Sequence, residues 1–216
     1  MPELDTPLHL GMLRDYKRRL GLLRGRIAFW RTPRIYGLQW GDPEQNEGLR
    51  TIKDRFVLPY CDPAHTALEI GPGGGRWTRY LLGFSRLYAV DYHDELLREL
   101  RKNFSEPNMV FVKNNGTDFP GVPDNAVDFV FTFGTFVHLD RDLIAAYLTN
   151  LRRVVKPGAN LVIQYSDKTK PTAQQNEGFS DNDPERMGEM IRQAGYTIVE
   201  EDRTTLPHSS VVRFTP

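Results

Sequence analysis

The sequence has few of the features that mark secreted or membrane proteins. Cys61 is the only cysteine among 216 residues, so the chain cannot form an internal disulfide bond. No apolar run approaches the roughly 20 residues that a membrane-spanning helix needs. Residues 1–5 lack the basic start and the apolar stretch of a secretory signal. We therefore expect a cytoplasmic protein with no membrane partner.

The chain also has no net charge, because 28 lysines and arginines balance 28 aspartates and glutamates. A balanced chain has no general attraction for nucleic acid, so we expect no nucleic-acid partner. The charge is uneven only between Arg14 and Arg34, where eight basic residues accompany a single acid, Asp15. That segment could bind a phosphate or an acidic acceptor, although such runs more often form a solvated helix face.

The first 60 residues are predicted to form a helical cap. Apolar residues recur at helical spacing in a first helix: Leu10, Leu13, Tyr16, Leu20 and Leu23. A second helix is expected to begin with Asp42 as its cap and Pro43 in its first turn, and to end at Pro59. We interpret residues 1–60 as a cap and substrate lid within the same domain as a cofactor-binding core, residues 61–216.

From residue 67 the pattern changes to short apolar runs that alternate with helical stretches. The predicted strands are Ala67–Ile70, Leu87–Val90, Met109–Val112, Val127–Phe133, Asn160–Tyr165, Thr197–Glu201 and Val211–Phe214. The predicted helices are Arg76–Gly83, Asp94–Asn103, Asp140–Val154 and Pro184–Ala194. Apolar strands separated by helices indicate a parallel sheet covered on both faces.

The connection between the last two predicted strands is about nine residues, too short for the crossover that a parallel pair needs. These two strands should therefore pair antiparallel. The predicted fold class is α/β and Rossmann-like, with a mostly parallel seven-stranded sheet and an antiparallel last strand.

A glycine-rich turn, Gly71–Gly75, follows the first predicted strand. Glycine is needed where a side chain would collide with a ligand lying across the turn. The dinucleotide pattern G-x-G-x-x-G would require glycine at Arg76, where arginine crowds the place of a pyrophosphate. Glu69, two residues before the turn, would repel phosphates but can help to order a loop that holds a cationic amino-acid tail.

A second acidic residue, Asp91, ends the next predicted strand, 20 residues after Gly71. A carboxylate in this place can accept hydrogen bonds from both hydroxyls of a ribose. Tyr92 follows and could pack on an adenine ring, although a surface tyrosine explains it almost as well.

These residues resemble the first motif of class I S-adenosylmethionine-dependent methyltransferases, an acidic residue, one spacer and G-x-G-x-G. Glu69, Gly71, Gly73 and Gly75 match it at every position. The resemblance covers roughly residues 65–200. It implies that the cofactor is S-adenosylmethionine and that the glycine turn holds its methionine part.

The resemblance also implies an adenine contact after the third strand. Aligned through Asp118, the acid of the relatives corresponds to Asn115, whose oxygen can still accept, and Gly116 offers its backbone N–H. Asp118 competes for this role, but a loop-capping aspartate needs no ligand. Phe133, at the end of the fourth strand, is the remaining residue assigned to the cofactor.

His138 is the candidate catalytic residue. An alcohol is a poor nucleophile, and a neutral histidine that takes its proton typically contributes about 10²–10⁴-fold in rate. His138 lies just past the fourth strand, and ligands of open α/β sheets bind at the carboxyl ends of strands. In many relatives a histidine here only shapes the pocket, and that alternative stays open. His208 is the only rival base.

The acceptor is expected to be a small molecule with a hydroxyl, most simply a sugar or glycoside. Aromatic rings such as Tyr36 and Trp40 can stack on sugar faces, although core packing explains them equally well. The polar loop 165–181 adds Tyr165 and Asp167 as acceptor-binding candidates. The Tyr36–Gly41 segment also resembles bacterial enzymes that methylate sugars or polysaccharide precursors.

Several alternatives remain at this point. The acceptor could be a carboxylate, an amine or a phenol, and an NAD-binding oxidoreductase is a more distant alternative. Metal-dependent relatives have an aspartate where this chain has Gly134 and Thr135, so no clear metal ligand set is present. An Mg²⁺ ion held through Asp167 stays an alternative. The sequence makes no prediction of oligomeric state.

Overall fold

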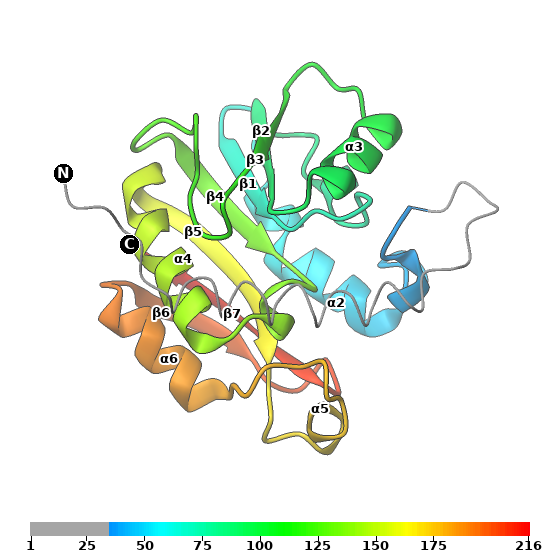
Figure 1. Cartoon of the computed structure of the whole chain (residues 1–216), viewed down its shortest axis with the longest axis vertical. Helices are drawn as coiled ribbons and strands as arrows, with labels where there is room; N and C mark the ends of the chain where they lie inside the picture. The colour runs from blue at the N-terminus through cyan, green and yellow to red at the C-terminus, as the bar shows by residue number, and fades with distance from the viewer. Residues whose placement is uncertain (1–34) are drawn as a thin grey trace.

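The computed structural model describes residues 35–216 and contains one seven-stranded sheet (Figure 1). The first predicted helix and the basic segment Arg14–Arg34 lie outside the described residues. The strands are β1 (Thr66–Ile70), β2 (Arg86–Asp91), β3 (Met109–Lys113), β4 (Val127–Thr132), β5 (Val155–Ser166), β6 (Thr197–Asp202) and β7 (Ser209–Thr215).

The strand order is β3-β2-β1-β4-β5-β7-β6. The first five strands pair parallel, and β7 runs antiparallel between β5 and β6. The expected α/β class, the mostly parallel sheet and the antiparallel terminal pair are therefore confirmed. Because the order reverses between β1 and β4, the carboxyl ends of these two strands form the switch point at which such sheets bind ligands.

Helices cover both faces of the sheet. They are α2 (Glu47–Phe56), α3 (Asp94–Asn103), α4 (Arg141–Val154), α5 (Pro171–Gln174) and α6 (Pro184–Gln193), with 3₁₀ turns η1 (Leu38–Trp40), η2 (Leu58–Tyr60), η3 (Thr78–Tyr80) and η4 (Phe136–His138). In Figure 1, α4 and α6 lie on the left of the sheet, and α2 and α3 lie on its right.

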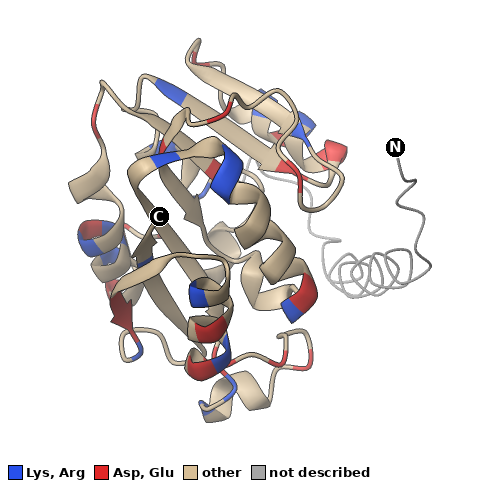
Figure 2. Cartoon of the chain, turned by 90° about the vertical axis from the view of Figure 1, so that its left-hand side faces the viewer, with Lys and Arg blue, Asp and Glu red and all other residues tan. Residues whose placement is uncertain are grey.

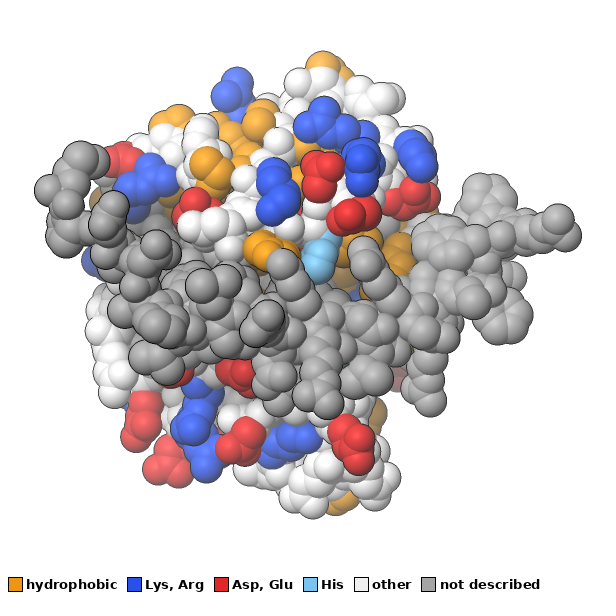
Figure 3. Space-filling model, in the orientation of Figure 1, with side chains coloured by type: hydrophobic (Ala, Val, Ile, Leu, Met, Phe, Trp, Pro, Cys, Tyr) orange, Lys and Arg blue, Asp and Glu red, His pale blue; other side chains and the backbone are white. Residues whose placement is uncertain are grey.

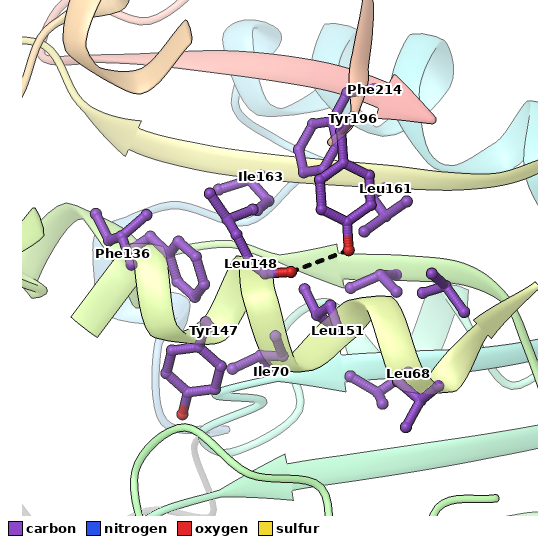
Figure 4. Packing of buried hydrophobic residues seen from close by; sticks show 14 of the residues in the cluster. Leu68, Ile70, Phe136, Tyr147, Leu148, Leu151, Leu161, Ile163, Tyr196 and Phe214 are labelled. Carbon is purple, nitrogen blue, oxygen red and sulfur yellow. Dashed lines mark hydrogen bonds between the residues drawn. The ribbon is translucent and has the colours of Figure 1, made fainter. Parts of the chain in front are cut away.

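One apolar cluster lies between the sheet and the pair α4 and α6 (Figure 4). Leu68 and Ile70 alternate along β1 toward this face, as the two-residue period of a strand requires. Leu148 and Leu151 of α4 pack against them and are fully buried. The buried hydroxyl of Tyr196 donates a hydrogen bond to the carbonyl of Leu148 in α4 at 3.0 Å.

On the opposite face of the sheet, residues 49–57 pack against the strands in a second buried cluster. Leu49, Ile52 and Phe56 occupy one side of α2 and belong to the same buried cluster as Phe129 of β4. The ring of Phe84 stacks on Phe129 at 5.5 Å between centroids. The segment before β1 therefore packs as part of the core.

Two predicted helices differ from the observed ones. Helix α2 begins at Glu47, and Asn46 caps it by accepting from the N–H of Leu49 at 3.0 Å. Asp42 instead accepts from the N–H of Glu44 at 2.9 Å, so the Asp-Pro pair makes a separate turn. The predicted start of this helix was wrong because both Asp42 and Asn46 are capping residues and the second one is used.

The predicted helix Arg76–Gly83 reduces to the single 3₁₀ turn η3. Its apolar spacing is helical, but three glycines precede it and Trp77 offers no capping oxygen. Strand β5 in turn begins at Val155, five residues before the predicted start. Helix α4 therefore passes directly into β5.

The charges of the described residues are mixed in sign. Acidic and basic residues alternate along the helices in Figure 2 and lie beside one another in the coloured part of Figure 3. None of the helices between residues 35 and 216 combines the length and apolar character needed to span a membrane.

Leu148→Ala tests the α4 layer. The side chain is fully buried, so its truncation should lower the free energy of unfolding by about 2–5 kcal/mol, measured by urea titration. Leu58→Ala is the matched control, because Leu58 is 44% exposed and should change stability little. Equal effects of the two substitutions would contradict this description of the core.

Candidate active site

A cavity of about 390 Å³ lies at the carboxyl ends of β1, β2 and β4. The lining residues are Tyr36, Gly37, Trp40, Leu49, Ile70, Gly71, Pro72, Gly73, Arg76, Trp77, Val90, Asp91, Tyr92, His93, Leu96, Phe133, Gly134, Thr135, Val137, His138, Tyr147, Gln164, Asn176, Gly178, Phe179 and His208. Its volume and mixed apolar and polar lining are those of a small-molecule site.

The glycine turn forms one wall of this cavity and leaves no room for side chains. Gly71 and Gly73 line the cavity with φ of +69° and +56°. A methyl group on Gly71 would lie 2.0 Å from Oγ1 of Thr135, and one on Gly74 would lie 2.3 Å from the backbone nitrogen of Tyr36. The turn therefore requires glycine for contact with the protein itself as well as with any ligand.

Glu69 and Gly75 belong to the turn but lie outside the cavity lining. Oε2 of Glu69 accepts from Oγ1 of Thr78 at 2.6 Å, which ties β1 to η3 behind the turn. Burial raises the pKa of Glu69 to about 8. At Gly75, with φ of +101°, a methyl group would lie 2.0 Å from the ring of Phe104. Both residues thus support the turn from behind.

Asp91 and Tyr92 both line the cavity at the end of β2. Oδ1 of Asp91 accepts from the backbone N–H of His93 at 2.7 Å, which orients the carboxyl group. Burial raises its pKa to about 7, against the opposing effects of that N–H and of Lys113. The ring of Tyr92 lies 4.5 Å from the ammonium group of Lys113.

His138 ends η4 and lines the cavity from the segment after β4. Its Nδ1 lies 2.7 Å from the carbonyl oxygen of Gly178, and its ring meets the edge of Phe179 at 5.4 Å. A carbonyl can only accept, so Nδ1 carries the hydrogen and donates it. In the neutral ring, Nε2 is then the nitrogen that can take up a proton.

Aromatic residues from the segment before α2 line one side of the cavity. The rings of Tyr36 and Trp40 meet edge to face at 5.3 Å between centroids. Trp40 is 53% exposed, so core packing does not account for it. His208 lines the cavity beside Phe179, and burial together with Lys170 and Arg76 lowers its pKa.

Four further predicted site residues lie away from the cavity lining. Tyr165 is fully buried, and its hydroxyl donates to Glu201. Asp167 accepts from the hydroxyl of Ser210 at 2.7 Å within the β5–β7 pair. The structure places these two predicted acceptor residues inside a buried hydrogen-bond network.

The other two, Asn115 and Gly116, form a turn after β3. The side-chain oxygen of Asn115 accepts from the N–H of Thr117 at 3.2 Å, while Asp118 accepts from the N–H of Asn115 at 2.7 Å. Both side chains are thus used within the loop, as a loop-capping role for Asp118 would require.

Sequence reasoning missed several lining residues. Gln164 bridges two strands, because its Oε1 accepts from the N–H of Gly134 at 2.6 Å and its Nε2 donates to Ser209 at 2.7 Å. Tyr147 reaches the cavity from α4, where its position fits an ordinary apolar helix face. Arg76 departs from the dinucleotide pattern, and its place in the cavity has no other signal in the sequence.

No group of three or more histidine, cysteine, aspartate or glutamate residues suited to a metal ion occurs within residues 35–216. Asp167, the proposed Mg²⁺ ligand, is bonded to Ser210 and to Thr169, and its carboxylate lies 3.7 Å from Lys170. The structure therefore gives the Mg²⁺ alternative no support.

Comparison with known proteins relates part of the chain to methyltransferases. Residues 68–163 match a family model described as a methyltransferase domain. A search of curated protein sequences finds no significant match. The matched range contains Glu69, the glycine turn, Asp91 and His138, so the family match and the cavity involve the same part of the chain.

Solved structures resemble the chain over most of its length. A methyltransferase dependent on S-adenosylmethionine from Aquifex aeolicus is 21% identical, covers 92% of this chain and 97% of its own, and has a TM-score of 0.60. One from Leishmania major is 15% identical, with 93% and 82% covered and a TM-score of 0.68. The DhpI–SAH complex is 19% identical, with 97% of both chains covered and a TM-score of 0.64. At these identities the likeness shows the fold.

The fold is the α/β fold of methyltransferases, and the cavity lies at the switch point of its sheet. The chain resembles class I, S-adenosylmethionine-dependent methyltransferases in its fold and in the segment that matches the methyltransferase-domain model. The cavity fits that cofactor, because its glycine wall has no side chains and Asp91 lies at the end of β2, where a ribose would be bound. The match to a methyltransferase-domain model disfavours the NAD-binding alternative.

Asp91→Asn tests the ribose assignment. An amide offers one accepting oxygen in place of a carboxylate, so the Kd for S-adenosylhomocysteine should rise about tenfold or more, measured by calorimetry. Since the pKa of Asp91 is raised to about 7, the protonated form dominates below that pH. Wild-type affinity should therefore rise about tenfold from pH 6 to pH 8.

The variant should lose most of this pH dependence. Asp94→Asn is the control, because Asp94 is an exposed residue in the first turn of α3. Unchanged affinity in Asp91→Asn, or the same pH slope as in the wild type, would contradict the assignment.

Proposed function

We propose that the protein transfers a methyl group from S-adenosylmethionine to a hydroxyl of a sugar or glycoside, with His138 as general base. The observation that carries this proposal is the orientation of His138. Its ring lines the same cavity as the glycine turn and Asp91, and the carbonyl of Gly178 fixes its tautomer.

The cofactor supplies an activated methyl group on a sulfonium, so the protein must position the acceptor and exclude water. The acceptor oxygen forms a bond to the methyl carbon as the carbon–sulfur bond breaks. His138 takes the hydroxyl proton at Nε2 and becomes an imidazolium. The carbonyl of Gly178, 2.7 Å from Nδ1, stabilises that cation by accepting its hydrogen bond. The imidazolium then releases its proton to solvent.

The aromatic side of the cavity supports a sugar acceptor. Trp40 presents an exposed ring beside Tyr36, and both line the cavity. Asn176 adds an amide group of the kind that binds hydroxyls. Since Tyr36 and Trp40 come from the segment before β1, they also support the interpretation of that segment as a substrate lid.

We propose, as a narrower resemblance, a mycobacterial 1-O-methyltransferase of methylmannose polysaccharide synthesis. Length and motif style carry that narrower resemblance. A panel of sugars and glycosides, with formation of S-adenosylhomocysteine as the readout, tests it.

His138→Ala should leave the Kd for S-adenosylhomocysteine within about twofold and reduce kcat about a hundredfold or more, because only the transition state needs the base. Added imidazole should restore part of the activity. His65→Ala is the control, since His65 lies outside the cavity lining and is exposed. Turnover at the wild-type rate in His138→Ala would show that this histidine only shapes the pocket.

A further inference from the structure

A buried arginine, Arg76, lines the cavity beside the proposed base segment. Arg76 is 7% exposed, and its guanidinium lies 5.4 Å from the ring centre of Phe133. A methyl group added to Gly134 would lie 3.6 Å from its Nη2. The guanidinium therefore lies at the carboxyl end of β4, where the chain continues to His138.

Arg76 has no carboxylate partner within the part of the chain that the structure describes. Its hydrogen bond to the carbonyl of Gly41 is long, at 3.4 Å. Of the nearby acids, Asp42 is paired with Arg79 and Glu69 is bonded behind the turn. A buried guanidinium without an anion is costly, and an anion bound in the cavity would remove that cost.

Charge in the cavity is divided between two places. Among the described residues, the lining contains one aspartate, Asp91 at the end of β2, and one arginine, Arg76. They do not form an ion pair. Burial lowers the pKa of Arg76 only to about 10, so it stays charged at neutral pH, and its charge helps to lower the pKa of His208. The side of the cavity formed by Arg76 is thus electropositive.

We propose that Arg76 binds an acidic group, a carboxylate or a phosphate, on the acceptor. This inference rests on the proposed function, and together the two specify an acidic sugar as the substrate class. A guanidinium can hold either anion through two parallel hydrogen bonds. The methionine tail of the cofactor also has a carboxylate. Nη2 lies beside Gly134, on the segment that leads to the proposed base. This position favours an acidic group of the acceptor over the cofactor carboxylate as the partner of Arg76.

The test is binding to protein saturated with S-adenosylhomocysteine, measured by calorimetry with matched sugars. Wild type should bind glucuronate or glucose 6-phosphate at least tenfold more tightly than glucose. Arg76→Gln should abolish this preference, and Arg76→Lys, which keeps the charge, should retain part of it. Arg98→Gln, on the exposed side of α3, is the control and should behave as wild type. No preference in the wild type, or its survival in Arg76→Gln, would overturn the proposal.

A second comparison separates the acceptor from the cofactor. Arg76→Gln should bind S-adenosylhomocysteine and 5′-methylthioadenosine, which lacks the amino-acid tail, as tightly as wild type does. If the variant loses tenfold affinity for S-adenosylhomocysteine alone, the guanidinium holds the carboxylate of the cofactor and the proposal is wrong.

A non-sugar pair, 4-hydroxybenzoate and phenol, separates this inference from the proposed function. A preference for the acid that Arg76→Gln removes, with no binding of any sugar, would support Arg76 as the acid-binding residue and contradict the sugar acceptor. Binding of neutral glucose as tightly as of its acidic counterparts would support the sugar acceptor and contradict Arg76 as the acid-binding residue.

Discussion

The glycine turn after β1 is the constraint on which the cavity depends. Its backbone approaches Thr135 and the backbone of Tyr36 so closely that a single methyl group at Gly71 or Gly74 would overlap them. The turn thus brings together the end of β1, the segment after β4 and the residues before α2. These segments contribute the proposed base and the aromatic wall, so their placement relative to one another follows from the absence of side chains in the turn.

Much of the fold could be predicted from the sequence because the sheet is buried on both faces. Its strands are therefore short apolar runs, and the loop before β7 is too short for a parallel crossover. The errors occur where local signals compete. Two capping residues precede α2, and the segment after the glycine turn has helical spacing without a capping oxygen.

The site could be predicted in part, at positions fixed by the ends of strands. Gly71 follows β1, Asp91 ends β2, and His138 ends the 3₁₀ turn after β4; all three line the cavity. Residues contributed by tertiary packing gave no local signal, as with Gln164, whose amide joins the β4 end to β7. Arg76 could be recognised only from the structure, because its lack of an acidic partner depends on where Asp42 and Glu69 direct their carboxylates.

The most direct test of the account is a thermal shift of the full chain with S-adenosylhomocysteine and, separately, with NADH. A ligand at 100 times its Kd stabilises a protein by about 2.7 kcal/mol, which corresponds to roughly 5–10 °C in a chain of this size. The account predicts a shift with S-adenosylhomocysteine and none with NADH. A shift with NADH alone would mean that the glycine turn holds a dinucleotide, and the methyl-transfer mechanism would be wrong.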